Sequence, residues 1–186
     1  MRIAAQQLAR LPSAELARRM AAGVAPRIES LAGNEFRGFN VPAITSLLGF
    51  QKFKKGFYLR ADESAAAGRC HGYNVSVVQN ELHQPWIATP SEAAPKRHGF
   101  YDVYPVAENK THRLFSNALL VDYGVRENAF MNPERLIRDY LVQPDPDDAN
   151  VLLGFATIAL GFTTVHFGFF VLDRDQPPVG FVPPPR

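Results

Sequence analysis

Two opposite charges, Arg138 and Asp139, interrupt the apolar segment 136–142. Side chains alternate between the two faces of a β-strand, so one of these charges points inward in either register. If Arg138 points inward, its planar guanidinium suits a carboxylate, from Asp122 or from an acidic ligand. If Asp139 points inward, burial raises its pKa and makes it the better general base. A purely structural ion pair is the alternative in both cases.

Further polar and aromatic residues on the expected strands are candidates for the same site. A polar group that points into an apolar interior needs a hydrogen-bonding partner or a ligand, because its burial otherwise costs free energy. His166 is expected to share a strand face with Phe170 and Leu172. The predicted ligand-binding residues are Phe36, Arg37, Tyr101, Asn117, Asp122, Arg138, Asp139, Tyr140 and His166.

The segment 50–57 interleaves phenylalanines with lysines 52, 54 and 55. One interpretation is a barrel mouth in which the ammonium groups hold an anionic headgroup and the rings contact an acyl chain. The other is a solvated strand face whose lysines protect a sheet edge.

The common catalytic motifs are absent from the sequence. There is no phosphate-binding glycine loop, no dinucleotide fingerprint, no H-E-x-x-H and no G-x-S-x-G. The five histidines lack metal-ligand spacing, and the single cysteine, Cys70, lies beside His71 in a polar segment and is expected to be an ordinary loop thiol. We therefore expect neither a metal nor a cofactor.

Composition narrows the class of protein. The 186 residues carry a net charge of +2, are 46% hydrophobic and include 14 phenylalanines. These values argue against a disordered chain and against a nucleic-acid binder that neutralises phosphates. No apolar run approaches the about 20 residues of a membrane span, and the charged start has no apolar signal core, so a cytoplasmic protein is expected.

The periodicity predicts helices first and strands afterwards. Ser13 is a suitable N-cap, Gly23 a suitable helix end, and Pro26 could begin a second short helix. A helical turn is expected at 42–48, loops at 61–70 and 88–97, and a tight exposed turn at 145–148. Strands are expected at about 34–40, 53–60, 73–79, 99–106, 117–123, 136–142, 151–159 and 165–173.

These elements indicate a mainly β protein with an antiparallel sandwich or barrel. No crossover helices separate the strands, which excludes parallel units. The segment 151–159 is apolar on both faces, and a barrel with N-terminal helices on its outside explains this. The expected organisation is a helical segment at 1–32, a β-barrel domain at 33–175 and an extended proline-rich tail at 176–186.

Four short motifs carry a family resemblance: N-E-F-R-G at 34–38, L-I-R-D-Y at 136–140, D-D at 147–148 followed by Gly154, and F-F-V-L-D-R at 169–174. Together they resemble small bacterial lipocalin-like proteins of the calycin type, which carry G-x-W-x-G on the first strand. Phe36 replaces the tryptophan of that motif, and Asn34 its first glycine. The resemblance implies a lipocalin-like barrel with a ligand cavity. It implies no reaction, because that family is functionally uncharacterised.

Three hypotheses about function follow. The first is binding of a small apolar or amphipathic molecule, such as a lipid, an acyl chain or a polyketide-like metabolite, inside the barrel. The second is a cofactor-independent cyclase or isomerase that uses Asp122 or Asp139 as general base and a Tyr or His as acid. The third is a solidly packed barrel that acts as an interaction protein. The first two hypotheses require a cavity inside the barrel, whereas the third requires a filled interior. The sequence is compatible with a homodimer but does not predict one.

Overall fold

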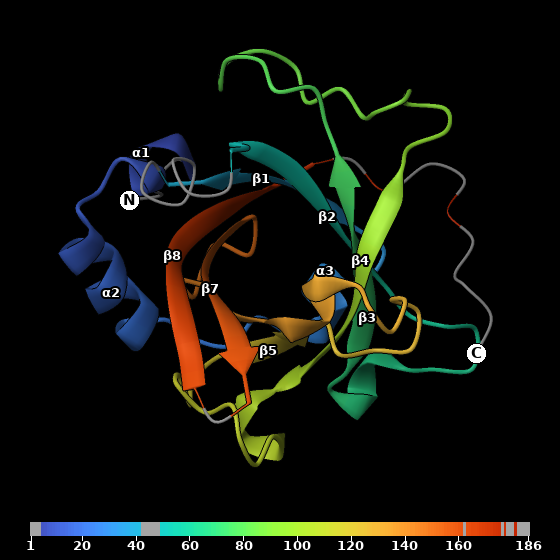
Figure 1. Ribbon diagram of the computed structural model, residues 1–186. Helices are drawn as coiled ribbons and strands as arrows, with labels where there is room; N and C mark the ends of the chain where they lie inside the picture. Colours follow the sequence, from blue (N-terminus) through green and yellow to red (C-terminus); the bar gives the residue numbers. More distant parts are fainter. Residues whose placement is uncertain (1–4, 42–48, 162, 176, 178–180, 182–186) are drawn as a thin grey trace.

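Eight antiparallel strands close into a barrel in the computed structural model, which describes residues 5–41, 49–161, 163–175, 177 and 181 (Figure 1). Each strand pairs with its sequence neighbours, and β1 also pairs with β8, so that Phe36 lies opposite Arg174. The strands are β1 (Glu35–Asn40), β2 (Lys52–Tyr58), β3 (Cys70–Ser76), β4 (Arg97–Pro105), β5 (Leu119–Asp122), β6 (Ile137–Val142), β7 (Val151–Leu160) and β8 (Thr163–Arg174). The predicted mainly β, antiparallel barrel is confirmed.

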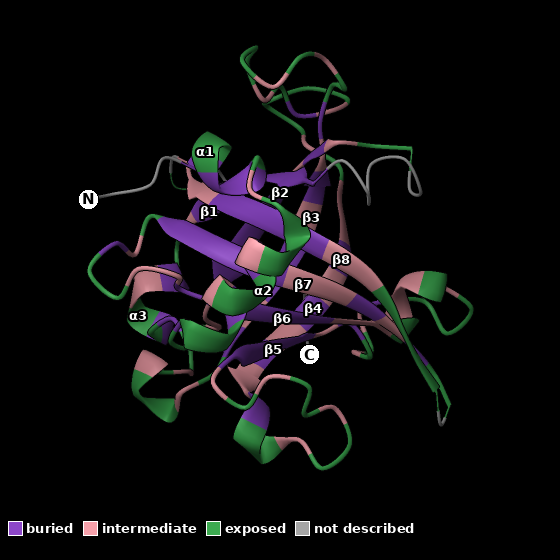
Figure 2. Cartoon of the chain, turned by 90° about the vertical axis from the view of Figure 1, so that its left-hand side faces the viewer, coloured by how far each residue is buried: buried purple, intermediate pink, exposed green. Residues whose placement is uncertain are grey.

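Helices α1 (Ala5–Ala9) and α2 (Ser13–Ala22) lie on the outside of β7 and β8 (Figures 1 and 2). Leu16 and Met20 of α2 are buried there in an apolar cluster that includes Phe169 and Val171. This cover explains why β7 is apolar on both faces. Pro12, and not Ser13, occupies the N-cap of α2, and no side chain caps this helix end.

The third helix, α3 (Ile28–Leu31), closes one end of the barrel lumen. Ile28 and Leu31 are buried in the interior cluster together with Phe36, Phe57 and Leu141. The helix starts two residues after the expected Pro26. The expected turn at 42–48 lies outside the described residues, as does most of the tail 176–186.

Three glycines face the lumen where a neighbouring aromatic ring crosses it. A Cβ on Gly38, Gly72 or Gly154 would lie between 2.0 and 2.2 Å from a ring atom. The rings belong to Phe53, Tyr101 and Phe170, which are their register partners on the adjacent strands. A side chain at these positions cannot coexist with the ring where it stands, so each glycine leaves room for one ring inside the lumen.

The connections gather at two ends of the barrel because the strands run antiparallel. The turn at 145–148 joins β6 to β7 at the α3 end, where the Asp148 amide donates to the Asp145 carbonyl at 3.0 Å. The predicted turn is confirmed, although Asp148 itself is buried. Cys70 does not lie in a loop: it begins β3 and points into the apolar interior, where burial raises the pKa of its thiol.

The end opposite α3 carries the cavity described below and is called the open end; the described parts of the connections β1–β2, β3–β4, β5–β6 and β7–β8 lie there. Within the part of the chain that the structure describes, no helix has the length and apolar character needed to cross a bilayer.

Candidate functional site

A cavity of about 510 Å³ occupies the open half of the barrel. Its apolar wall includes Phe53, Ile137, Ile158, Phe167 and Phe170. The interior is therefore not packed solid. Its polar lining comes from six strands and loops and includes Asn40, Lys55, Asn74, Ser76, Gln79, His98, Tyr123, Glu134, Asp139 and Thr157.

The ammonium group of Lys55 lies at the centre of the polar lining. Its side chain is only 3% exposed, because alternation along β2 turns it into the lumen between Phe53 and Phe57. The Nζ atom donates to Asn74 Oδ1 at 3.1 Å, to Asp139 Oδ2 at 3.3 Å and to the Tyr123 hydroxyl oxygen. An ammonium has three N–H groups, so all of its donors are used by protein acceptors.

Aromatic rings surround this buried cation. The Nζ atom lies 4.8 Å from the ring centroid of Tyr101, 4.9 Å from that of Tyr123 and 5.5 Å from that of Phe170. The electron-rich ring faces attract a cation and offset part of its desolvation. Burial nevertheless lowers the pKa of Lys55, while the carboxylate of Asp139 opposes this shift.

Asp139 is the partner carboxylate, and its two oxygens differ. Oδ2 receives the Lys55 ammonium and the Tyr123 hydroxyl, both at 3.3 Å. Oδ1 is buried and has no hydrogen-bond partner among the described residues. Burial raises the pKa of Asp139, and Lys55 holds the increase back. The site thus contains a carboxylate that lines the cavity and has unused acceptor capacity on Oδ1, an oxygen with almost no accessible surface of its own.

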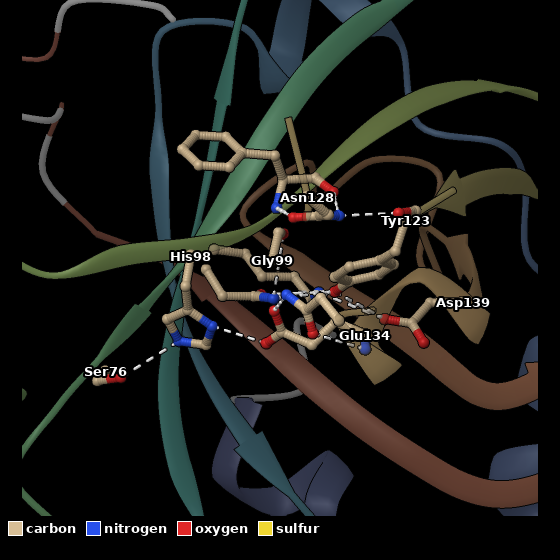
Figure 3. A network of polar contacts seen from close by, with 11 residues as sticks. Ser76, His98, Gly99, Tyr123, Asn128, Glu134 and Asp139 are labelled. Atoms are coloured by element: carbon tan, nitrogen blue, oxygen red, sulfur yellow. Dashed lines mark hydrogen bonds and ion pairs between the residues drawn. The ribbon is translucent and has the colours of Figure 1, made fainter. Parts of the chain in front are cut away.

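A second chain of polar contacts reaches the cavity from β3, β4 and the β5–β6 connection (Figure 3). His98 Nδ1 lies 2.7 Å from Glu134 Oε1, and His98 Nε2 lies 3.2 Å from Ser76 Oγ. The carboxylate can only accept, so Nδ1 carries the proton. The hydrogen bond from His98 lowers the pKa of Glu134, whose other oxygen accepts from the Asn132 amide at 2.9 Å. Imidazole and hydroxyl are therefore held in fixed orientations at the cavity wall.

The predicted charge pair divides as the alternation requires: Asp139 faces the lumen and Arg138 the outside. Arg138 Nε lies 3.1 Å from Asp122 Oδ1, and the Tyr104 hydroxyl donates to the other oxygen of Asp122 at 2.8 Å. Neither Arg138 nor Asp122 lines the cavity. Asp139 forms an ion pair with Lys55, and its role as a general base stays a prediction.

The other predicted residues are spread over both sides of the wall. Phe36 and Tyr101 are inside, packed below the cavity, and the Tyr101 hydroxyl donates to the Gly56 carbonyl at 3.0 Å. Arg37 is outside and pairs with Asp173 at 3.3 Å. Tyr140 also lies outside, under the N-terminal helices, where Asn117 donates to the Met20 and Gly23 carbonyls at the end of α2.

The strand face predicted for His166 is wrong. The ladder pairs Ala156 with Gly168 but Thr157 with His166, so Phe167 is an extra residue on β8. This bulge shifts the alternation by one position. His166 is exposed and contacts the outer ring of Phe155 at 5.5 Å between centroids, while Phe167 lines the cavity.

The solvated face predicted for the lysines of β2 is also wrong, because a closed barrel has no edge to protect. Lys52, Lys54 and Lys55 are all buried. Lys52 lies outside the barrel, where its ammonium donates to the carbonyls of Glu81, Gln84 and Pro85. It thereby fixes the β3–β4 connection beside the open end.

The sequence suggested Lys55 only as one of the lysines of segment 50–57, and it did not suggest the other residues that dominate the site: Asn74, Ser76, His98, Tyr123 and Glu134. The alternation already placed Lys55 between Phe53 and Phe57 on one face, and this was the available signal. The others come from separate elements that only the closed barrel brings together.

Comparison with known proteins adds no family: neither the protein-family models nor the curated proteins include a match to this chain. The lipocalin-like resemblance therefore stays a prediction. Among the described residues, no group of three His, Cys, Asp or Glu side chains is placed to hold a metal ion.

Proposed function

We propose that this protein binds a small apolar or amphipathic molecule in the open half of its barrel. The cavity carries this proposal: about 510 Å³ lies within the range of ligand pockets, and most of the wall is apolar. One polar cluster of the wall consists of Lys55 with Asn74, Tyr123 and Asp139, so a ligand with one polar end would bind with that end toward it. Lipids, acyl chains and polyketide-like metabolites are candidates of this type.

The surroundings of the open end support the same proposal. Among the described residues, most of the exposed large apolar side chains lie on the four connections at this end or on the strand ends beside them. They are Phe50, Val78, Ile87, Phe130, Met131, Leu136, Leu160 and Val165. Phe130 and Met131 are each 86% exposed. An apolar ligand that enters here passes over apolar surface before it reaches the cavity.

A titration with Nile red, an uncharged apolar dye, tests the proposal. We expect saturable fluorescence enhancement at one site per chain. The variant Ala156→Trp, which fills the cavity from its wall, should reduce the enhancement strongly while the circular dichroism spectrum is kept. Wild-type protein that gives no saturable signal with Nile red, and no co-purified molecule in native mass spectrometry, would contradict binding in the barrel.

Proton transfer is a second candidate function, and the free oxygen of Asp139 favours it. A buried carboxylate with a raised pKa can remove a proton from a bound substrate, and Tyr123 or His98 could return one. The test follows exchange of the α-protons of 2-decanone in D₂O by NMR. Exchange that is faster with wild type than with Asp139→Asn supports this role. Equal rates for the two proteins would exclude Asp139 as the base for ketones of this kind.

A further inference from the structure

The unused oxygen of Asp139 restricts what the cavity can hold. This oxygen, Oδ1, is buried, and the side chain of Asp139 is only 5% exposed. A buried carboxylate oxygen without a hydrogen bond is costly, so a ligand that supplies a donor gains more than one that does not. The complementary group on the ligand is an O–H or N–H.

The charges of the site select among these donors. Lys55 and Asp139 form one cation and one anion at 3.3 Å, so their charges cancel, and the second carboxylate of the lining, Glu134, is engaged by His98. A ligand carboxylate would bring a second anion beside Asp139, and no N–H of Lys55 is left to receive it. A ligand ammonium would meet the cation of Lys55 in the same space. Burial of an uncompensated charge is unfavourable in either case.

We propose that the ligand is an uncharged amphipathic alcohol or phenol whose hydroxyl donates to the Asp139 carboxylate, which turns its unpartnered Oδ1 toward the cavity when the ligand binds. This rests on the proposed binding function and specifies its ligand class. The aromatic and aliphatic wall around Phe53, Phe167 and Phe170 would hold the apolar part of the molecule. The same contact would place the hydroxyl where Asp139 could accept its proton, so the inference applies to a binding protein and to an enzyme.

Displacement of Nile red by matched ten-carbon ligands tests the ligand class. 1-Decanol carries a donor, 1-methoxydecane has an acceptor but no donor, and decanoate carries the anion. We expect 1-decanol to displace the dye at about tenfold lower concentration than either of the others. A hydrogen bond to a charged group contributes about 1.5–3 kcal/mol, and about 1.4 kcal/mol corresponds to a tenfold difference in affinity. This comparison uses the wild-type protein alone.

The variant Asp139→Asn should remove the preference. Lys55 can only donate, so the new amide turns its oxygen toward Nζ and its NH₂ group toward the ligand. The group that faces the ligand thus changes from an acceptor to a donor. We expect the ratio between the displacing concentrations of the ether and the alcohol to fall below about threefold. Asp122→Asn is the matched control, since it changes a carboxylate of the neighbouring strand that pairs with Arg138 outside the lumen. It should keep the wild-type ratio.

The outcomes separate this inference from the proposed function. If Nile red binds saturably but alcohol and ether compete equally in wild type, the cavity binds ligands and the inference is wrong. Decanoate that competes as well as decanol would also overturn it. If the ratio between the displacing concentrations of ether and alcohol is the same in wild type and in Asp139→Asn, a group other than Asp139 causes the preference for the alcohol, and the inference is wrong. If neither dye nor competitor binds, the proposed function fails and the inference falls with it.

Discussion

Removal of the Lys55 ammonium alone should destabilise the protein far more than removal of the whole ion pair. In Lys55→Met the Asp139 carboxylate stays in the lumen without its counter-charge and loses one of its two hydrogen bonds. Breaking one partner of a buried pair costs about 3–5 kcal/mol. This is a large part of a typical unfolding free energy of about 5–15 kcal/mol. The variant Asp139→Leu should cost a similar amount, because it leaves the ammonium unpaired.

The double variant Lys55→Met/Asp139→Leu removes both charges and replaces them with apolar side chains of similar size. Such replacements are often neutral or stabilising by about 1–4 kcal/mol. We therefore expect its unfolding free energy to lie near that of wild type and well above that of either single variant. Urea denaturation, analysed with a common m-value, measures the unfolding free energy of the wild type, the two single variants and the double variant.

The outer pair on the neighbouring strands supplies the control. Arg138 and Asp122 lie 3.1 Å apart, but their side chains are 15% and 20% exposed. The inner pair is only 3% and 5% exposed, so water screens the outer pair more, and we expect a smaller coupling free energy for the outer pair in the corresponding cycle. A double inner variant whose loss equals the sum of the two single losses would refute the reasoning that the inner ions depend on each other.

The Lys55→Met variant also predicts a pH effect. Burial raises the pKa of Asp139 in the folded state, and this increase should grow without Lys55. A folded-state pKa above the unfolded value means that the folded state is favoured when the group is protonated. The loss of stability in Lys55→Met should therefore be larger at pH 7 than at mildly acidic pH. A loss that is equal at both pH values would contradict this.

Three further outcomes are expected elsewhere in the molecule. Gly154→Val should displace the Phe170 ring, whose nearest atom would lie 2.0 Å from the new Cβ, and lower stability by about 1–3 kcal/mol in urea; an unchanged midpoint would show that the ring moves freely. Burial opposes a charge on His71, but hydrogen bonds to two carboxylates raise its pKa, so the stability that it adds relative to His71→Gln should be present at pH 5.5 and decline as pH rises through the raised value; a loss independent of pH would argue against the charged form. A four-residue Gly/Ser insertion between Pro146 and Asp147, both exposed, should cost less than about 1 kcal/mol by thermal denaturation, and failure to fold would show that this turn is part of the core.

The alternation of side chains along each strand predicted which residues face the lumen better than it predicted the contacts that they make there. It placed Asp139 and Arg138 on opposite faces and Lys55 beside Phe53, and the structure has both. It failed at His166, since one extra residue on β8 reverses the phase; the isolated Gly168 beside it, at a φ of 126°, was the available signal of a bulge. Alternation does not show what covers each face of a strand. Lys55 meets the opposite wall of the lumen, whereas Lys52, on the outside, is buried by the β3–β4 connection.

The polar network could not be predicted because its members are far apart in sequence. His98 and Glu134 are joined across 36 residues, and Lys55 and Asp139 across 84. Each residue alone has an ordinary local explanation as a surface or turn residue. Only the pairing register of six strands brings them within hydrogen-bonding distance.

The first helix of the fold packs on the last strand, and β1 pairs with that same strand (Figure 1). During synthesis, therefore, the edge of β1 that pairs with β8 and the side of α1 that packs on β8 lack these partners until the segment 163–174 has left the ribosome. Chains elongate at about 5–20 residues per second, and contacts of such long sequence separation also form slowly. For several seconds Phe39 and Leu8 remain accessible to chaperones and to other nascent chains. Closure of the barrel ends this exposure, because it needs β8. We therefore expect substitutions that weaken β8 to reduce the yield of folded protein even where they leave the cavity intact.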